Sequence, residues 1–252
     1  MANALVTGAS RGIGRATAVA LSIRGDRVVV HYGHDRDAAE ETLALLHGEG
    51  HGIVGGDLSD PETAREVVTQ AREALGSIDI LVNNAALAPS PATFHRIDQT
   101  DYDTWQRIWT RMVDVDLLAA ANVTHLVANA LIDTGAPGAI VNVGSRGANR
   151  GEPDFPAYGA AKAGLHAFGQ SIAVALAPHG ISVATVAPGF IGTERQEAKL
   201  SGADGDALRA QSPFGRVGTA EEVAAAIVYL TSPDAQWASG AVLDLNGASH
   251  LR

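Results

Sequence analysis

The sequence predicts an α/β protein with a Rossmann-type, doubly wound parallel sheet of about seven strands and helices on both faces. Short, nearly continuous apolar runs alternate with segments of helical length along the whole chain, as expected for strands buried on both faces of a parallel sheet. A glycine-rich turn joins the first apolar run to the first helical segment. No repeat, linker or change in composition divides the 252 residues, so we expect one domain spanning residues 1–252.

The strands are expected where Val, Ile, Leu and Ala cluster. These runs are Ala4–Thr7, Arg27–Tyr32, Gly52–Gly56, Ile78–Asn83, Ala139–Gly144, Ile181–Ala187 and Ala241–Leu245. Because crossovers between parallel strands are right-handed, helices are expected on both faces of the sheet.

The helices have recognisable starts. The run Ser59–Glu62, with Pro61 in the first turn, is typical of a capped start, and Thr219–Glu222 has a capping-box pattern. One apolar helix face is predicted from side chains at helical spacing, Leu165, Phe168, Ile172 and Ala175. The polar stretch at about 190–212 is interpreted either as a substrate lid or as an ordinary pair of solvated helices.

Composition excludes several functional classes. A formal net charge of −10 disfavours binding to nucleic acid or to an anionic membrane. The chain has no cysteine, and its histidines lack metal-ligand spacing, so no metal site is expected. The start of the chain does not resemble a signal peptide, and no apolar stretch is expected to reach the roughly 20 residues of a membrane span. We therefore expect a cytoplasmic protein.

The first strand-to-helix turn, Thr7–Gly14, has the character of a phosphate-binding turn. Gly8 permits a positive φ, and Gly12 and Gly14 remove side chains where a pyrophosphate would approach the backbone. The free N–H groups of the following helix face the same anion. The turn residues expected to bind the cofactor are Gly8, Ser10, Arg11, Gly12, Ile13 and Gly14.

Glycine spacing and later motifs together resemble the short-chain dehydrogenase/reductase family, in its branch of roughly 250 residues. The likeness covers essentially the whole chain. Its motifs are the glycine turn, Asp57-Leu58, Asn83–Ala86, Ser145, Tyr158-Gly159-Ala160-Ala161-Lys162, Pro188-Gly189 and Gly215–Ala224. The resemblance implies an oxidoreductase that transfers hydride between a nicotinamide and a small carbonyl compound or alcohol.

The resemblance implies a catalytic role for Ser145, Tyr158 and Lys162. Lys162 lies one helical turn after Tyr158, so both side chains share a face. A free tyrosine has a pKa of about 10, and we expect the ammonium and an oxidised nicotinamide to lower it. Tyr158 then donates a proton in reduction and accepts one in oxidation, while Ser145 binds the same oxygen.

Two positions depart from the family pattern. The family asparagine that helps to hold a water in the proton relay is replaced by Asp116, which keeps the backbone carbonyl but lacks the amide. Ala86 replaces a usual glycine beside the cofactor. Asp116 is the only support for an alternative interpretation, in which the chain is a catalytically impaired dinucleotide-binding sensor or scaffold.

The resemblance also places the two ends of the cofactor. At the adenine end it implies contacts from the Asp57 carboxylate and the Leu58 N–H, with Asn84 and Ala85 beside the ribose. At the nicotinamide end it implies contacts from four residues, Pro188, Gly189, Ile191 and Thr193.

The second strand indicates which nicotinamide cofactor is used. An acid at its end selects NAD, whereas a nearby base suits the 2′-phosphate of NADP. Tyr32 stands where the acid is usual, and Arg11 lies in the glycine turn with His34 nearby. NADP is therefore favoured over NAD, although Asp35 remains able to face the ribose.

The best overall interpretation is an NADP(H)-dependent carbonyl reductase or alcohol dehydrogenase that forms a homotetramer or homodimer. The substrate pocket is expected to include Arg146, Ala148, Glu152, Pro153, Asp154 and Phe155. A 3-oxoacyl group on a carrier protein is the alternative substrate. The acidic net charge disfavours docking of an acidic carrier protein, although Arg146 and Arg150 offer a local basic spot.

Overall fold

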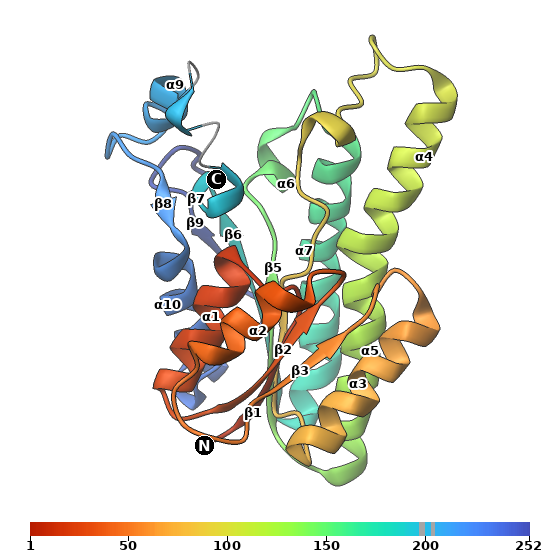
Figure 1. Ribbon diagram of the computed structural model, residues 1–252, viewed down its shortest axis with the longest axis vertical. Helices are drawn as coiled ribbons and strands as arrows, with labels where there is room; N and C mark the ends of the chain where they lie inside the picture. The colour runs from red at the N-terminus through yellow and green to blue at the C-terminus, as the bar shows by residue number, and fades with distance from the viewer. Residues whose placement is uncertain (197–199, 203–204) are drawn as a thin grey trace.

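The computed structural model describes residues 1–196, 200–202 and 205–252 and contains a seven-stranded parallel sheet in the order β3-β2-β1-β4-β5-β6-β9 (Figure 1). The strands are β1 (Asn3–Val6), β2 (Arg27–Tyr32), β3 (Gly52–Gly55), β4 (Ile80–Asn83), β5 (Gly138–Val143), β6 (Ile181–Pro188) and β9 (Val242–Leu245). Each overlaps a predicted strand, and every pair in the sheet is parallel. The predicted doubly wound fold class is confirmed.

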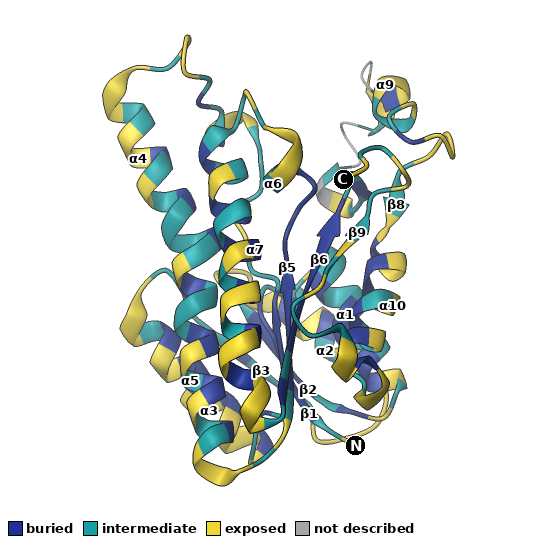
Figure 2. Ribbon diagram, turned by 180° about the vertical axis from the view of Figure 1, so that it is seen from behind, coloured by how far each residue is buried: buried dark blue, intermediate teal, exposed yellow. Residues whose placement is uncertain are grey.

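Helices cover both faces of the sheet (Figures 1 and 2). One layer consists of α1 (Gly12–Ile23), α2 (Arg36–Ala44) and α10 (Ala220–Leu230). The other layer consists of α3 (Pro61–Leu75), α4 (Tyr102–Val113), α5 (Ala119–Thr134) and α7 (Pro156–Leu176). Adjacent residues of β1 point to opposite faces, so Leu5 packs in the core under α3 and α5 while Ala4 and Val6 pack in the core under α1 and α10.

The predicted helix starts are present. Asp60 caps α3 by accepting a hydrogen bond from the Glu62 N–H, and Thr219 and Glu222 form the capping box of α10. The predicted apolar face of α7 is wrong at one position, because Ala175 is exposed. Ala173 is buried instead, since the buried line of this helix advances four residues at a time from Leu165.

Helices α4 and α5 form one continuous helical run, joined by a π-helical turn at Asp114–Leu118. This corrects one expectation, because the run Tyr102–Thr134 is long and apolar enough to cross a membrane by length and composition. In the structure this run packs against α3 and α7. A core helix of a folded domain can have the same length and apolar composition as a membrane span. Asp116 lies within the π-helical turn, a feature that often marks functional sites.

The predicted lid leaves the sheet after β6. Its first residues form β7 (Ile191–Gly192), which pairs with β8 (Gly218–Thr219) in a separate two-stranded sheet. A 3₁₀ turn, Glu194–Gln196, and α9 (Gly205–Arg209) follow within the segment, beyond the carboxyl edge of the main sheet (Figure 1). Residues 197–199 and 203–204 of the predicted lid lie outside the described residues.

A buried histidine links the glycine turn to the neighbouring strands. Nδ1 of His31 accepts a hydrogen bond of 3.1 Å from the Gly8 N–H, and its Nε2–H donates to the Gly56 carbonyl at 2.9 Å. The side chain is 2% exposed, and burial lowers its pKa to about 4. The neutral ring therefore holds the turn after β1 against the turn after β3.

His31 should make the stability of the protein dependent on pH. The unfolded histidine takes up a proton below its ordinary pKa of about 6.5, which the folded protein resists until about pH 4. Stability attributable to His31 is thus complete above pH 6.5 and is lost as the pH falls toward 4, by about 2 kcal/mol at pH 5. Between pH 7.5 and pH 5, the free energy of unfolding should therefore fall by about 2 kcal/mol less in His31→Gln than in the wild type.

Denaturant titration at the two pH values measures this difference. The exposed His179→Gln variant is the control and should follow the wild type. An identical pH dependence in wild type and His31→Gln would contradict the assignment.

Candidate active site

A cleft of about 660 Å³ lies at the carboxyl edge of the sheet, where β1 sits between β2 and β4. Chain order reverses at this point, which is where doubly wound sheets bind ligands. The cleft brings together most of the predicted site residues, namely Gly8, Ser10, Arg11, Gly12, Ile13, His34, Asp57, Leu58, Asn84, Ala85, Ala86, Ser145, Tyr158, Lys162, Pro188, Gly189, Ile191 and Thr193. Gly14, Tyr32 and Asp116 do not line it.

The glycine turn exposes bare backbone to the cleft. Gly8 and Gly12 have φ values of 61° and 56°, the left-handed region in which glycine is favoured. Gly14 allows a close approach within the turn, because a Cβ there would lie 2.4 Å from the Gly8 carbonyl oxygen and 2.5 Å from Nδ2 of Asn84. A turn without side chains ahead of the first turn of α1 fits a pyrophosphate.

Asn84 maintains the shape of this turn. Its Nδ2 donates to the carbonyl oxygens of Thr7 at 2.8 Å and Gly8 at 2.9 Å. Oγ1 of Thr7 in turn accepts hydrogen bonds from the N–H groups of Asn84 and Ala85. The ends of β1 and β4 are therefore joined beside the cleft.

At the predicted adenine end, Asp57 is held in an ion pair that the sequence did not indicate. Nη2 of Arg111 in α4 lies 2.8 Å from Oδ2 of Asp57, and the Ser59 hydroxyl donates to Oδ1 at 2.8 Å. Partial burial opposes ionisation, but the hydrogen bonds from Arg111 and Ser59 lower the pKa of Asp57 to about 2. Asp57 is therefore an ionised acceptor at neutral pH, consistent with a contact to an amino group.

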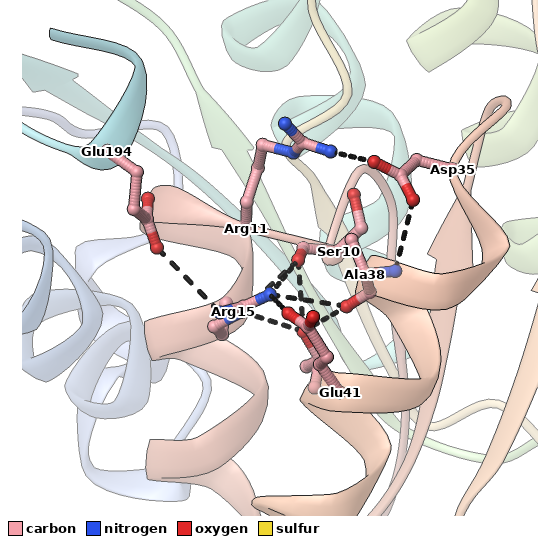
Figure 3. Close-up of polar contacts among 8 residues, drawn as sticks. Ser10, Arg11, Arg15, Asp35, Ala38, Glu41 and Glu194 are labelled. Atoms are coloured by element: carbon pink, nitrogen blue, oxygen red, sulfur yellow. Dashed lines mark hydrogen bonds and ion pairs between the residues drawn. The ribbon is translucent and has the colours of Figure 1, made fainter.

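Arg11 projects from the glycine turn and forms an ion pair with Asp35, the N-cap of α2 (Figure 3). Both side chains are about half exposed. The predicted contact residue Tyr32 is turned away, since a Cβ on Gly55 would lie 2.4 Å from its ring. The charged groups at this corner of the cleft are therefore Arg11 and Asp35.

Arg15, one turn into α1, ties this corner together (Figure 3). It donates to the Ser10 carbonyl at 2.7 Å, to Oγ1 of Thr42 at 2.9 Å and to the Glu41 carboxylate at 3.1 Å. It also lies 3.8 Å from Glu194 in the segment after β7. No sequence motif indicated these contacts, because they join helices that are distant in the chain.

At the other end of the cleft, α7 places Tyr158 and Lys162 beside Ser145, which follows β5. Oγ of Ser145 accepts a hydrogen bond of 3.0 Å from the Gly147 N–H, which leaves its own proton free to donate. The Ser145 hydroxyl lies close enough to the phenol of Tyr158 to lower the pKa of that phenol. Lys162 is 3% exposed, donates to the Val143 carbonyl at 3.1 Å and has its Nζ 5.8 Å from the centre of the Tyr158 ring.

Several groups of the chain act on the pKa of Tyr158. Burial raises it, the negative charges of Asp116 and Glu152 raise it further, and the Ser145 hydroxyl only partly opposes this rise. The lowering expected from the Lys162 ammonium together with an oxidised nicotinamide stays a prediction, because it concerns the protein with its cofactor. Burial also lowers the pKa of Lys162, while Asp116 raises it.

Asp116 lies behind the catalytic group and not in the cleft. It is 1% exposed; Oδ1 accepts a hydrogen bond of 2.8 Å from the Leu87 N–H, and Oδ2 has no hydrogen-bond partner among the described residues. Burial raises its pKa to about 6, although Lys162 and the Leu87 N–H oppose the rise. A titratable carboxyl group therefore occupies the position at which the resemblance implies an asparagine.

A second buried histidine, His166, supports the backbone at Ser145. Nε2 of His166 accepts a hydrogen bond of 3.4 Å from the Ser145 N–H, and burial lowers the pKa of His166 to about 4. The same ring fills the space over Gly144, where a Cβ would lie 2.1 Å from Nε2. The sequence analysis missed this residue, although its spacing of one turn after Lys162 was visible.

The structure brings part of the expected substrate pocket to the cleft. Arg146, Glu152 and Phe155 line the cleft, whereas Ala148, Pro153 and Asp154 do not.

At the nicotinamide end, a Cβ on Gly12 would lie 3.3 Å from Cγ2 of Thr193, so the segment after β6 lies against the glycine turn. Among the residues that the structure describes, no group of three or more His, Asp or Glu side chains is placed to hold a metal ion.

Comparison with known proteins gives matches along the whole chain. A family profile described as "Enoyl-(Acyl carrier protein) reductase" matches residues 8–250. L-rhamnose 1-dehydrogenase (NAD(P)(+)) of Sphingomonas sp. (strain SKA58) is 34% identical over 98% of this chain and 95% of its own length. The 3-oxoacyl-[acyl-carrier-protein] reductase FabG of Escherichia coli (strain K12) is 34% identical over 98% of this chain and 97% of its own.

The fold is similar to that of a solved structure as well. The crystal structure of gox2181 superimposes with a TM-score of 0.88 at 30% identity, covering 99% of this chain and 96% of that one. Because profile, relatives and structure agree over nearly every residue, the chain belongs to the short-chain dehydrogenase/reductase family of NAD(P)-dependent oxidoreductases.

Proposed function

We propose that the protein interconverts a small ketone and a secondary alcohol with NADP(H), using Tyr158 as the acid and base. The observation that carries this proposal is that the hydroxyl groups of Ser145 and Tyr158 lie close together in the cleft, with Lys162 one turn behind Tyr158. Two hydroxyl groups that meet in a cleft provide what a reacting carbonyl oxygen requires: a proton and a stabilising donor.

In reduction, the carbonyl oxygen accepts hydrogen bonds from Tyr158 and Ser145. The bound nicotinamide supplies the hydride. The Tyr158 hydroxyl donates its proton to the oxygen as negative charge develops there, and the Ser145 hydroxyl stabilises that charge. In oxidation Tyr158 accepts the alcohol proton instead.

Lys162 and Asp116 surround the far side of Tyr158. One proton of Lys162 is engaged by the Val143 carbonyl, so the others remain free to face the cofactor and Tyr158. The buried, half-satisfied carboxyl of Asp116 lies close enough to affect the pKa of both groups. The alternative, a sensor or scaffold that binds a dinucleotide without turnover, rests on this carboxyl alone.

Arg11 supports a preference for NADP. Its guanidinium lies at the corner of the cleft, and its present partner, Asp35, is exposed enough for a 2′-phosphate to displace it (Figure 3). Tyr32 offers no carboxylate to a ribose diol. Asp35 keeps the NAD alternative open, because its carboxylate is able to accept bonds from that diol.

The relatives differ in what their names say they act on, namely a sugar and a carrier-bound acyl group. We infer a free small molecule, because the formal net charge of −10 disfavours docking of an acidic carrier protein. Arg146 is buried and donates to Ser249 and Gln211, and Arg150 also donates to Gln211.

We also infer a homotetramer or homodimer built on the long helices. Apolar side chains are exposed on α7 and on the π-helical turn, where Val174 is 78% and Leu118 46% exposed. We take these exposed apolar side chains as the candidate contacts between subunits.

Tyr158→Phe should reduce kcat at least a hundredfold while leaving cofactor binding intact. The phenol is the proton carrier, and general acid–base groups typically contribute a hundredfold or more, whereas the ring still packs. Absorbance at 340 nm with a panel of ketones measures turnover, and fluorescence titration measures NADPH binding. The exposed Tyr229→Phe serves as the control. Retention of more than about a tenth of wild-type kcat would assign the proton transfer to another group.

Asp116→Asn should leave alcohol oxidation at pH 8 equal to or faster than that of the wild type. Above pH 6 the ionised Asp116 raises the pKa of Tyr158, and the amide removes this effect. An ionisation near pH 6 should also disappear from the profile of kcat against pH. Asp114→Asn, in the same π-helical turn, is the control. Collapse of activity with an unchanged circular dichroism spectrum would show that the carboxyl has a specific role.

NADPH should bind more tightly than NADH, and Arg11→Ala should narrow the gap. A charged contact to the 2′-phosphate is worth about 1.5–3 kcal/mol, or roughly tenfold to a hundredfold in Kd, and NADH makes no such contact. Calorimetric titration with both cofactors provides the values. Arg36→Ala is the control, since Arg36 pairs with Glu40 on α2 outside the cleft. A wild type that prefers NADH would overturn the cofactor assignment.

A further inference from the structure

We propose that Glu152 binds hydroxyl groups of the substrate and that the enzyme acts on a polyhydroxylated molecule such as a free sugar. This inference rests on the function proposed above, because it concerns the substrate end of the same cleft. It starts from where the side chain lies. A Cβ on Gly147 would be 2.6 Å from Oε1 of Glu152, and a Cβ on Gly159 would be 3.6 Å from its Cβ.

These two glycines place the carboxylate beside the reacting centre. Gly147 is the residue whose N–H fixes the Ser145 hydroxyl, and Gly159 directly follows Tyr158. Glu152 therefore occupies the space that side chains at both positions would fill. It lines the cleft and lies close enough to raise the pKa of Tyr158.

The carboxylate of Glu152 has no hydrogen bond or ion pair among the described residues, although the side chain is about half buried. Other carboxylates nearby are partnered: Asp57 with Arg111, Asp35 with Arg11, and Asp154 with Arg96 at 3.2 Å. A half-buried carboxylate has lost part of its contact with water. No hydrogen-bond donor among the described residues replaces that contact for Glu152. A ligand that carries hydrogen-bond donors would restore it.

The arginines at this end have neutral hydrogen-bond partners and keep their charge. Arg146 donates to Ser249 and Gln211, and Arg150 donates to Oε1 of Gln211 at 3.3 Å. Their charges favour ionisation of Glu152, whereas burial, the larger effect, raises the pKa of Glu152. The substrate end therefore offers a carboxylate whose oxygens accept no hydrogen bond from the described residues.

Sugar hydroxyls match these surroundings. A hydroxyl donates to a carboxylate in a charge-assisted hydrogen bond, and adjacent hydroxyls are able to share its two oxygens. Phe155 and Phe190 also line the cleft and offer apolar surface to the C–H faces of a sugar ring. A few placed polar groups among apolar ones are typical of small-molecule sites.

The test compares free aldopyranoses with tetrahydropyran-2-ol, which has the same ring and reacting hemiacetal but no other hydroxyls. Oxidation moves hydride from the anomeric carbon to the nicotinamide and the hydroxyl proton to Tyr158, leaving a lactone. The ratio of kcat/KM for the best sugar to that for the stripped ring should exceed tenfold in the wild type. In Glu152→Gln this ratio should fall about tenfold to a hundredfold, the cost of losing a charged hydrogen bond.

Glu221→Gln is the matched control, because it makes the same chemical change at an exposed residue outside the cleft. Its ratio should equal that of the wild type. An unchanged ratio in Glu152→Gln overturns the inference. So does a wild type whose kcat/KM is higher for tetrahydropyran-2-ol, for the cationic alcohol 3-hydroxypiperidine or for an acetoacetyl group on carrier protein than for every sugar. Failure of the wild type to turn over any alcohol or carbonyl compound with either nicotinamide overturns the proposed function itself.

Discussion

The close approach of the first turn to the end of β4 is the constraint on which the rest of the site depends. Gly14 leaves room for Asn84 to reach the Thr7 and Gly8 carbonyls. Oγ1 of Thr7 in turn accepts hydrogen bonds from the backbone N–H groups of the two residues that follow β4. His31 fixes the same turn from the other side. With both neighbours fixed, bare backbone N–H groups face the point where strand order reverses, and the cleft follows from that geometry.

A second constraint is electrostatic and lies beneath the end of the cleft that holds Tyr158. Asp116 and Lys162 are both almost fully buried, and each makes ionisation of the other easier while burial makes it harder. Such a pair gains little net stability, because the cost of removing two charges from water offsets their attraction. Its consequence is functional: the charges next to Tyr158 are fixed in place by α7 and the π-helical turn, so their effect on the phenol does not need to be assembled during reaction.

The seven strands, the capped helix starts and most of the cleft residues were predictable because each depends on local pattern: apolar runs, capping residues and glycines at fixed spacing. The ion pairs of Asp57 with Arg111 and Asp35 with Arg11 were not, because they join residues whose contact is made only by packing. The rise that burial imposes on the pKa of Tyr158 was not predictable for the same reason. Sequence shows which charges are near in the chain, whereas burial, the larger effect, is a property of the fold.

That raised pKa bears on how the chain and its cofactor divide the chemistry. A buried phenol beside Asp116 and Glu152 stays protonated at neutral pH, which is the state that a proton donor in carbonyl reduction requires. Oxidation requires the phenolate, which burial and the two carboxyl groups disfavour, so it depends on nearby positive charge. Lys162 lies beside the ring, and an oxidised nicotinamide would add a second positive charge that the reduced form lacks. In the role proposed for Tyr158, the chain therefore favours the acid form, and an oxidised cofactor would shift the balance toward the base.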